Sequence, residues 1–433
     1  MGDSSVKAFF WLSAFFVVYC ARPEDWIPVL GYFPLAKITA ILAMWGLFNS
    51  GGRSKRTLKD LPREATLLLA MLLLLYLGAF LSPVWKGGAL SHMVDFSKIY
   101  IAWALVFLLI TTFNRLRRII IIQAVSVAVV CGIALIKGRT VDRLEGVIGG
   151  IYSNPNDLAF AIVLSLPFVL ALMMTAKSAV KKVLWLAGML VMLIAIFETA
   201  SRAGFIDLVI SGAVTLYYFA IKGRRMYLLV ATAFLSVLIG VTVGGKLYDR
   251  FQALSGNSTT EQSAYGSYEQ RKYLMLKAVE AVESYPIFGI GARNFPAYSQ
   301  AWRDVHVTYL QVAAEGGIPV FIIYILFFRR AFQNLKILRK RTDLDPDIVL
   351  FVGALTSSLV GFGVGALFAP EMYQYFPYFA VAFTAALLQT TKEQDQERGL
   401  GAGSTADSSK KARHFLEVYA ERGRTSSTVT PVR

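Results

Sequence analysis

The sequence predicts an all-α polytopic membrane protein with about 12 transmembrane helices. Hydrophobic residues make up 56% of the 433 residues, and the mean hydropathy is +0.54, whereas an average soluble domain is about 45–50% apolar. The apolar residues lie in continuous runs of about 15–22 residues, the length that a helix needs to cross a bilayer. Only helices and closed barrels satisfy their backbone hydrogen bonds in lipid, and continuous rather than alternating runs favour helices.

The predicted helices are joined mostly by short polar connections. They occupy residues 6–20, 27–48, 65–81, 99–113, 119–136, 158–174, 183–197, 204–221, 226–243, 307–328, 349–368 and 376–388. The first run is interpreted as an uncleaved helix, because its n-region has a single cation, Lys7, and bulky Tyr19 stands where a signal-peptide cleavage site would need a small residue. Cys20 and Cys131 both lie in apolar runs and show neither a disulfide framework nor metal-ligand spacing.

Positive charge alternates between successive loops. Every second loop carries three to six cations, namely Arg53, Lys55, Arg56, Lys59 and Arg63; Arg115, Arg117 and Arg118; Lys177, Lys181 and Lys182; Lys222, Arg224 and Arg225; and Arg329, Arg330, Lys336, Arg339, Lys340 and Arg341. The positive-inside rule therefore predicts that both termini are cytoplasmic. The same distribution attributes the net charge of +16 to membrane topology and not to nucleic-acid binding.

The chain divides into four predicted segments. Residues 1–243 hold helices 1–9, 244–305 form a long extracytoplasmic (periplasmic) loop between helices 9 and 10, and 306–390 hold helices 10–12. Residues 391–433 are polar and predict a disordered cytoplasmic tail. Within the long loop, residues 267–285 have an amphipathic helical pattern that ends at Pro286. A loop of this length is more often functional than passive.

Arginines in the predicted outer connections are informative, because the positive-inside rule works against them. They are Arg139, Arg143, Arg202, Arg271, Arg293 and Arg303. Arg202 lies in a very tight turn between two apolar runs, where a guanidinium is costly unless it is paired or lines a wet cavity. Glu198 and Asp207 are its possible partners, and an interfacial snorkelling arginine is the alternative interpretation.

Two further motifs lie in the long loop and at its end. Gly289 and Gly291 would let the backbone approach a ligand closely, although a plain turn is equally compatible and the third glycine of a dinucleotide site is missing. His306 stands where the chain re-enters the membrane and could orient or deprotonate a hydroxyl near neutral pH, with an interfacial hydrogen-bonding residue as the alternative. Glu315, about 13 Å of helix further in, is expected to be a buried partner for an arginine.

In this order, the motifs resemble the O-antigen ligase and polymerase superfamily. The resemblance covers roughly residues 152–324 and rests on the residues just described: Ser201-Arg202-Ala203-Gly204 at a helix start, Arg271 in the long loop, Pro286-x-x-Gly289-x-Gly291, His306 with Glu315-Gly316-Gly317, and the Ser153–Asp157 stretch. It implies a GT-C-like glycosyltransferase that inverts the anomeric centre as it moves a glycan from undecaprenyl diphosphate to an acceptor hydroxyl. No cofactor and no metal are implied.

The resemblance also assigns roles to residues. Arginines matching Arg202, Arg271 and Arg293 would bind the diphosphate, because guanidinium forks hold phosphate bidentately, and His306 would activate or orient the acceptor. Arg139, Arg143, Gly289, Gly291 and Glu315 are expected to complete the substrate site. Val307 departs from the family pattern, in which Asn, Ser or Gln often follows the histidine, and this leaves the subgroup open.

Several functions share this donor chemistry. The preferred one is a ligase of the bacterial inner membrane, with its active site facing the periplasm, that moves a finished glycan onto lipid A–core or another outer acceptor. An O-antigen or exopolysaccharide polymerase and a protein O-oligosaccharyltransferase are the alternatives. A polysaccharide transporter would place functional charges near the bilayer midplane, whereas the unusual charges here lie toward the outer surface.

Overall fold

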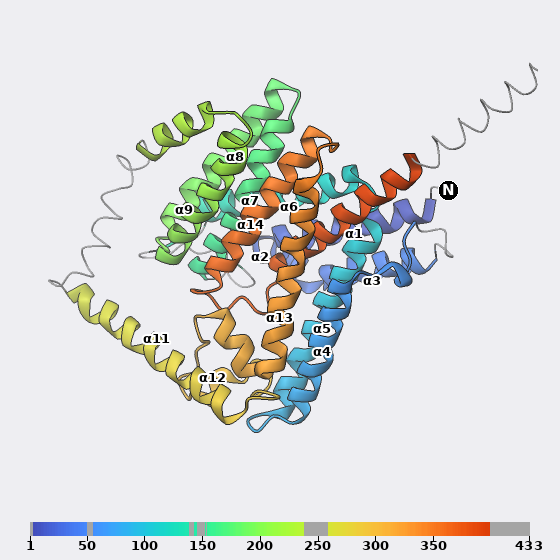
Figure 1. Cartoon of the computed structure of the whole chain (residues 1–433). Helices are drawn as coiled ribbons and strands as arrows, with labels where there is room; N and C mark the ends of the chain where they lie inside the picture. The colour runs from blue at the N-terminus through green and yellow to red at the C-terminus, as the bar shows by residue number, and fades with distance from the viewer. Residues whose placement is uncertain are drawn as a thin grey trace, which may run out of the picture.

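The computed structural model describes residues 3–49, 55–137, 143–144, 152, 154–237 and 259–398 (Figure 1). Within these ranges all regular structure is helical, and eight helices are long and apolar enough to cross a membrane. This confirms a polytopic all-α membrane protein. The total of about 12 spanning helices stays a prediction.

The helices fall into two groups by length and hydropathy. Those of membrane length are α4 (Arg63–Phe80), α5 (Lys86–Leu109), α6 (Phe113–Lys137), α7 (Pro155–Thr175), α8 (Ala179–Glu198), α9 (Arg202–Leu216) with its continuation η3 (Tyr217–Ile221), α13 (Thr308–Lys340) and α14 (Pro346–Gly365). The others are α1 (Asp3–Ala21), α2 (Pro23–Trp26), η1 (Pro28–Tyr32), α3 (Leu35–Phe48), η2 (Leu58–Asp60), the helix Tyr227–Val237, α11 (Thr259–Ser284), α12 (Phe295–Tyr298) and a last helix over 375–398.

Two predicted helices have different bounds in the structure. The helix predicted over 27–48 begins only at Leu35, because Pro28 and Pro34 lack an amide hydrogen and disfavour a helical residue before them. The helix predicted over 99–113 begins at Lys86 and ends at Leu109. Its first turns contain the ion-paired Asp95 and Lys98, which lower the hydropathy of a segment that is nevertheless helical.

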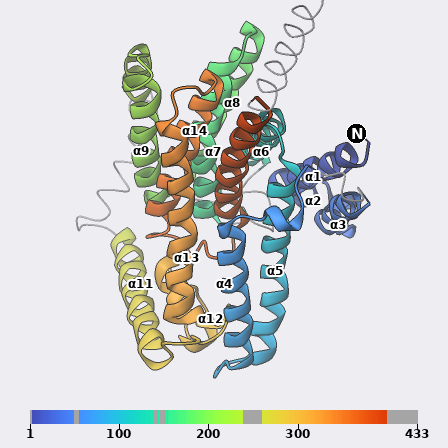
Figure 2. The same cartoon turned by 45° about the vertical axis from the view of Figure 1, so that its right-hand side comes forward.

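The helices pack into one bundle with a continuous apolar core. α4 lies against α5 and α13, α7 against α8, α9 and α14, and α1 against α3 and α6. Figure 2 shows α1, α2 and α3 as a group at the side of the upright helices.

Much of α8 is apolar yet exposed, including Val180, Val183 and Leu184. Such a face is unfavourable in water and favourable in lipid.

The two ends of the bundle collect different connections. At one end, Arg117 Nη1 lies 3.2 Å from Asp347 Oδ2, and its Nη2 donates to Thr175 Oγ1 at 2.9 Å, so the starts of α6 and α14 meet the end of α7. The connections that meet here are among the cation-rich loops of the sequence, and this end is called the basic end. At the other, the α11 end, Ser82 Oγ donates to the carbonyl of Ile290 at 2.6 Å. The grouping agrees with the alternation of charge along the sequence.

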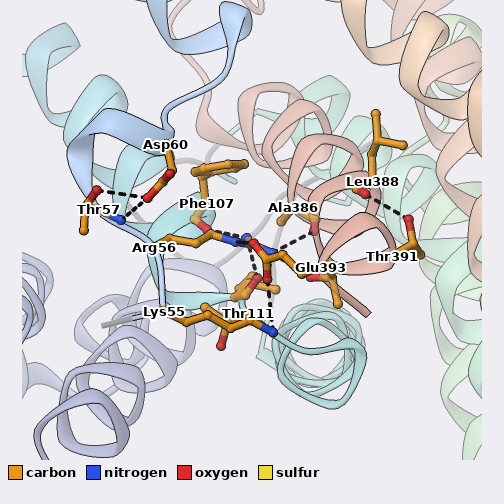
Figure 3. Close-up of polar contacts among 12 residues, drawn as sticks. Lys55, Arg56, Thr57, Asp60, Phe107, Thr111, Ala386, Leu388, Thr391 and Glu393 are labelled. Carbon is orange, nitrogen blue, oxygen red and sulfur yellow. Dashed lines mark hydrogen bonds and ion pairs between the residues drawn. The ribbon is translucent and has the colours of Figure 1, made fainter. Parts of the chain in front are cut away.

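A buried arginine, Arg56, links several segments at the basic end (Figure 3). The Arg56 side chain is 1% exposed, and its Nε lies 2.7 Å from Glu393 Oε1. Its Nη1 donates to the carbonyls of Phe107 and Ile110, each at 2.8 Å, and its Nη2 donates to Thr390 Oγ1 at 2.8 Å. A buried guanidinium is stable only when its hydrogens and charge are satisfied in this way. Arg56 therefore joins the segment before α4, the end of α5 and the last helix.

The last helix corrects the predicted start of the tail. Disorder was predicted from residue 391, whereas the helix continues to residue 398 and carries Glu393 into the contact with Arg56. Residues 399–433 lie outside the described ranges.

The long helix α13 folds back on itself. Gly317 has the non-helical angles φ 82° and ψ 171°. Tyr309, before it, donates its hydroxyl to the carbonyl of Gly363 at 2.7 Å, and Phe328, after it, stacks on Phe362 with centroids 4.6 Å apart. In a straight helix Tyr309 and Phe328 would be about 28 Å apart. Because both reach the same turn of α14, two limbs must diverge from Gly317.

This fold-back corrects the single helix predicted over 307–328. The first limb is short and begins at Thr308, and the second runs to Lys340. The kink is held by the Ile318 amide, which donates to the carbonyl of Pro286 at 2.7 Å. The chain between α11 and α12 thus packs directly against the kink.

Candidate functional site

The glycine turn after α11 is fixed against the first limb of α13. Gly289 and Gly291 have φ of +64° and +94°, a backbone conformation that favours glycine. The amides of Ile290 and Gly291 donate to the carbonyls of Ala314 and Glu315 at 2.9 and 3.0 Å. A Cβ atom at Gly289 would lie 2.5 Å from the Glu315 carbonyl. The close approach that these glycines allow is therefore to other parts of the protein, namely backbone at Gly289 and the Ser82 and Asn294 side chains at Gly291.

Asn294 ties the same turn to the α4–α5 connection. Its Nδ2 donates to Ser82 Oγ at 2.8 Å, to the carbonyl of Ile290 at 3.0 Å and to the carbonyl of Trp85 at 3.2 Å. The backbone of the neighbouring Arg293 is therefore held in place while its side chain remains partly exposed.

The Arg293 guanidinium lies over an aromatic ring at the α11 end. Its Cζ is 4.7 Å from the centroid of Tyr373, and its Nη1 is 3.9 Å from Asp304 Oδ2. The Tyr373 hydroxyl donates to Glu315 Oε2 at 2.5 Å, and the Phe295 amide donates to Glu315 Oε1 at 3.4 Å. Glu315 is fully buried. Its carboxylate thus accepts hydrogen bonds from a hydroxyl and an amide, and the charge of Arg293 also acts on it.

Arg202 and Arg271 lie close enough to repel each other. Arg202 is the first residue of α9 and is exposed, and Ser201 caps the helix by accepting a hydrogen bond from the Gly204 amide at 3.1 Å. Arg271 lies on α11. Partial desolvation and the charge of Arg202 lower the pKa of Arg271. Two converging guanidinium groups are unfavourable unless an anion lies between them or beside them.

His306 is half-buried, within electrostatic reach of Arg271, Arg303 and Asp304. Burial lowers the pKa of His306, the charges on Arg271 and Arg303 lower it further, and Asp304 opposes them. The imidazole is therefore neutral near pH 7 and able to accept a proton. Arg271 connects His306 electrostatically with Arg202, and Asp304 connects it with Arg293.

Four predicted residues thus form one set at the α11 end, the arginine cluster, which consists of Arg202, Arg271, Arg293 and His306. They come from α9, from α11 and from the segment between α11 and α13. The fold brings them together although they span more than a hundred residues of sequence.

Arg143 binds the turn that precedes Arg202. Its Nε donates to the carbonyl of Thr199 and its Nη2 to Asn156 Oδ1, both at 3.0 Å, and Ser201 Oγ donates to the same Asn156 oxygen at 2.7 Å. Arg143 therefore holds the α8–α9 turn against the start of α7. Arg139 lies outside the described residues.

One family model matches part of the chain. Residues 187–325 match the family model described as O-antigen ligase. The match confirms the resemblance drawn from the motifs, and it includes all four residues of the arginine cluster. No curated protein sequence matches the chain.

A solved structure is also similar to the chain. It comes from the work titled "Structural coordination of polymerization and crosslinking by a peptidoglycan synthase complex". The similarity covers 76% of this chain and 97% of that one, with 15% sequence identity and a TM-score of 0.41. At this score the likeness supports no conclusion about this protein.

Two residues beside the arginine cluster lie beyond the matched segment, in the connection after α14. One is Tyr373, whose ring lies under the Arg293 guanidinium. The other is Glu371, whose amide donates to Thr308 Oγ1 at 2.9 Å. Burial raises the pKa of the Glu371 carboxyl, and the charges on Asp157 and Asp207 raise it further. Neither residue was predicted to belong to the site. An acidic residue followed by a tyrosine in a predicted outer connection was the available signal.

Metal ligation is a separate question. Within the described ranges, no group of three or more His, Cys, Asp or Glu side chains could hold a metal ion. Metal independence stays a prediction from the family resemblance.

Proposed function

We propose that the protein transfers a glycan from undecaprenyl diphosphate to an acceptor hydroxyl. The observation that carries the proposal is the electrostatic link of Arg202 with Arg271 and of Arg271 with His306, with Arg293 joined through Asp304, in a segment that matches the O-antigen ligase family. The leaving group of such a reaction is an anionic lipid diphosphate. Converging guanidinium groups bind it through bidentate hydrogen bonds, and the bound anion relieves their mutual repulsion.

The chemistry of transfer follows from these groups. The acceptor oxygen attacks the anomeric carbon as the bond to the diphosphate oxygen breaks, which inverts the anomeric centre. The arginine cluster stabilises the negative charge that develops on the leaving oxygen. His306, neutral at physiological pH, takes the proton of the acceptor hydroxyl.

The proposed topology places the basic end in the cytoplasm and the α11 end in the periplasm. The asymmetry of positive charge supports this orientation, and it puts both termini in the cytoplasm and the cluster at the outer surface of the bacterial inner membrane. A lipid-linked donor then meets the site at the level of its headgroup.

The preferred acceptor is lipid A–core, which makes the protein an O-antigen ligase. A second lipid-linked repeat would make it a polymerase, and a Ser or Thr side chain would make it a protein O-oligosaccharyltransferase. These three activities share the donor, so the acceptor must be identified by experiment.

The experiment uses the purified protein in proteoliposomes with a polyprenyl-diphosphate-linked glycan and a lipid A–core acceptor. Glycan on the acceptor supports a ligase, whereas longer lipid-linked chains with the acceptor unchanged support a polymerase. Transfer should be lost in Arg202→Ala, Arg271→Ala and His306→Ala. Lys272→Ala is the matched control, an exposed cation adjacent to Arg271 on α11. Full activity in all three cluster variants, or an intact donor moved across the bilayer, would refute the proposal.

A further inference from the structure

We propose that Tyr373 is a positioning residue that holds the Arg293 guanidinium for the donor diphosphate. The proposal rests on the function proposed above, in which Arg293 binds that diphosphate. Tyr373 lies 48 residues beyond the end of the segment that matches the ligase family, since that segment ends at residue 325.

The geometry of the pair suits phosphate binding. The guanidinium carbon of Arg293 is 4.7 Å from the centroid of the Tyr373 ring, within the range of a cation–π contact. A guanidinium stacked on a ring keeps its N–H donors in its own plane. These donors remain free to bind phosphate oxygens while the ring restricts the side chain. Binding then costs less side-chain entropy than it would for an unsupported arginine.

The other contact of the Arg293 guanidinium is weaker. Its Nη1 lies 3.9 Å from Asp304 Oδ2, and both side chains are about a third exposed. Exposed ion pairs at such distances contribute little to holding a side chain in one place. A diphosphate can replace this carboxylate on the guanidinium edge without disturbing the stacked face. The ring is therefore the contact that persists when the donor binds.

The Tyr373 ring is itself held from two sides. Its hydroxyl donates to Glu315 Oε2 at 2.5 Å, and its ring meets the edge of Phe96 with centroids 5.9 Å apart. Glu315 also binds the Phe295 amide through Oε1, and its carbonyl accepts from Gly291. One buried residue thus fixes both the turn that carries Arg293 and the ring beneath its guanidinium.

The test measures the binding of undecaprenyl diphosphate to the full-length protein in nanodiscs. Tyr373→Leu removes the ring and should weaken binding about tenfold, and Tyr373→Phe keeps the ring and should weaken it by no more than about threefold. Tyr375→Leu is the control, because Tyr375 packs on Tyr19 and not on an arginine. It should bind like the unmodified protein. Equal binding by Tyr373→Leu and Tyr375→Leu would overturn the proposal.

A double-mutant cycle separates positioning from a general loss of structure. In the Arg293→Ala background, Tyr373→Leu should cause no further loss of affinity, because its effect passes through the missing guanidinium. A further tenfold loss would mean that Tyr373 acts in another way. If Arg293→Ala alone leaves the affinity unchanged, the proposed diphosphate site is wrong, whereas an effect of Arg293→Ala without an effect of Tyr373→Leu refutes only the positioning role.

Discussion

Replacing Arg56 by alanine removes the central side chain of the basic end. The guanidinium, 1% exposed, binds Glu393, two carbonyls at the end of α5 and Thr390, and its Cζ lies 4.9 Å from the ring of Phe107. Its removal leaves Glu393 with one exposed partner, Lys55, and leaves carbonyl oxygens without their donor. Breaking a buried ion pair in this way costs about 3–5 kcal/mol.

The effect should be measurable as a fall in the apparent melting temperature. An unfolding entropy of about 2.1 cal/mol/K per residue gives about 0.9 kcal/mol/K for 433 residues, so a loss of about 4 kcal/mol lowers the melting temperature by about 4 °C. The assay is thermal unfolding of the protein in nanodiscs, followed by intrinsic tryptophan fluorescence. Glu393→Ala should produce a loss of similar size, because it leaves the guanidinium buried without its counter-charge.

Lys55→Ala is the matched control. Lys55 binds the same glutamate at 3.3 Å, but its side chain is 37% exposed, and exposed pairs contribute about 0–1 kcal/mol. Its melting temperature should therefore fall by about 1 °C or less. If Arg56→Ala is no less stable than Lys55→Ala, the buried contacts do not stabilise the fold as argued.

Two further predictions concern the kink and the histidine. Gly317→Ala should destabilise the protein by at least about 1–2 kcal/mol, because its φ of 82° disfavours a side chain and a Cβ atom there would lie 2.3 Å from the Ile287 carbonyl oxygen. Gly212→Ala is the control and should be tolerated in the same melting assay, because a Cβ atom at Gly212 would have nothing within 4 Å. Arg303→Gln removes a charge that lowers the pKa of His306, so the acidic limb of the pH–rate profile for transfer should move to higher pH, whereas Asp304→Asn should move it to lower pH. Shifts in the same direction would contradict the assignment of His306 as the base.

Much of the fold could be predicted from the sequence, because the length and continuity of apolar runs follow from the thickness of the bilayer. The amphipathic segment 267–285 is confirmed by α11, and the alternation of basic loops agrees with the contacts at the two ends. The failures are local. Hydropathy cannot distinguish a straight helix from two limbs joined at Gly317, since both bury the same apolar residues. It also placed the start of α5 too late, at residue 99, because polar residues lie in the first turns of that helix.

A site residue could be predicted only where its residue type was unexpected for its position in the topology. Arg202, Arg271 and Arg293 stood out as cations in outer connections. Tyr373 did not, because a tyrosine beside other aromatic residues resembles ordinary packing, and its role depends on a contact across 80 residues of sequence. Arg143 was an equally unusual cation in an outer connection, yet its partners include a backbone carbonyl. A sequence pattern of side chains does not reveal such a partner.

The fold-back of α13 has a consequence for how the protein is made. Its first limb is fixed at Thr308 by bonds to the carbonyls of Ala366 and Ala369, the second of them 61 residues later in the chain. At about 5–20 residues per second, a ribosome needs about 3–12 s to supply that partner after Thr308 has been synthesised. During this interval His306 has been synthesised but has no fixed position. A nascent chain that stopped before α14 would contain every residue of the arginine cluster and still lack the scaffold that arranges them.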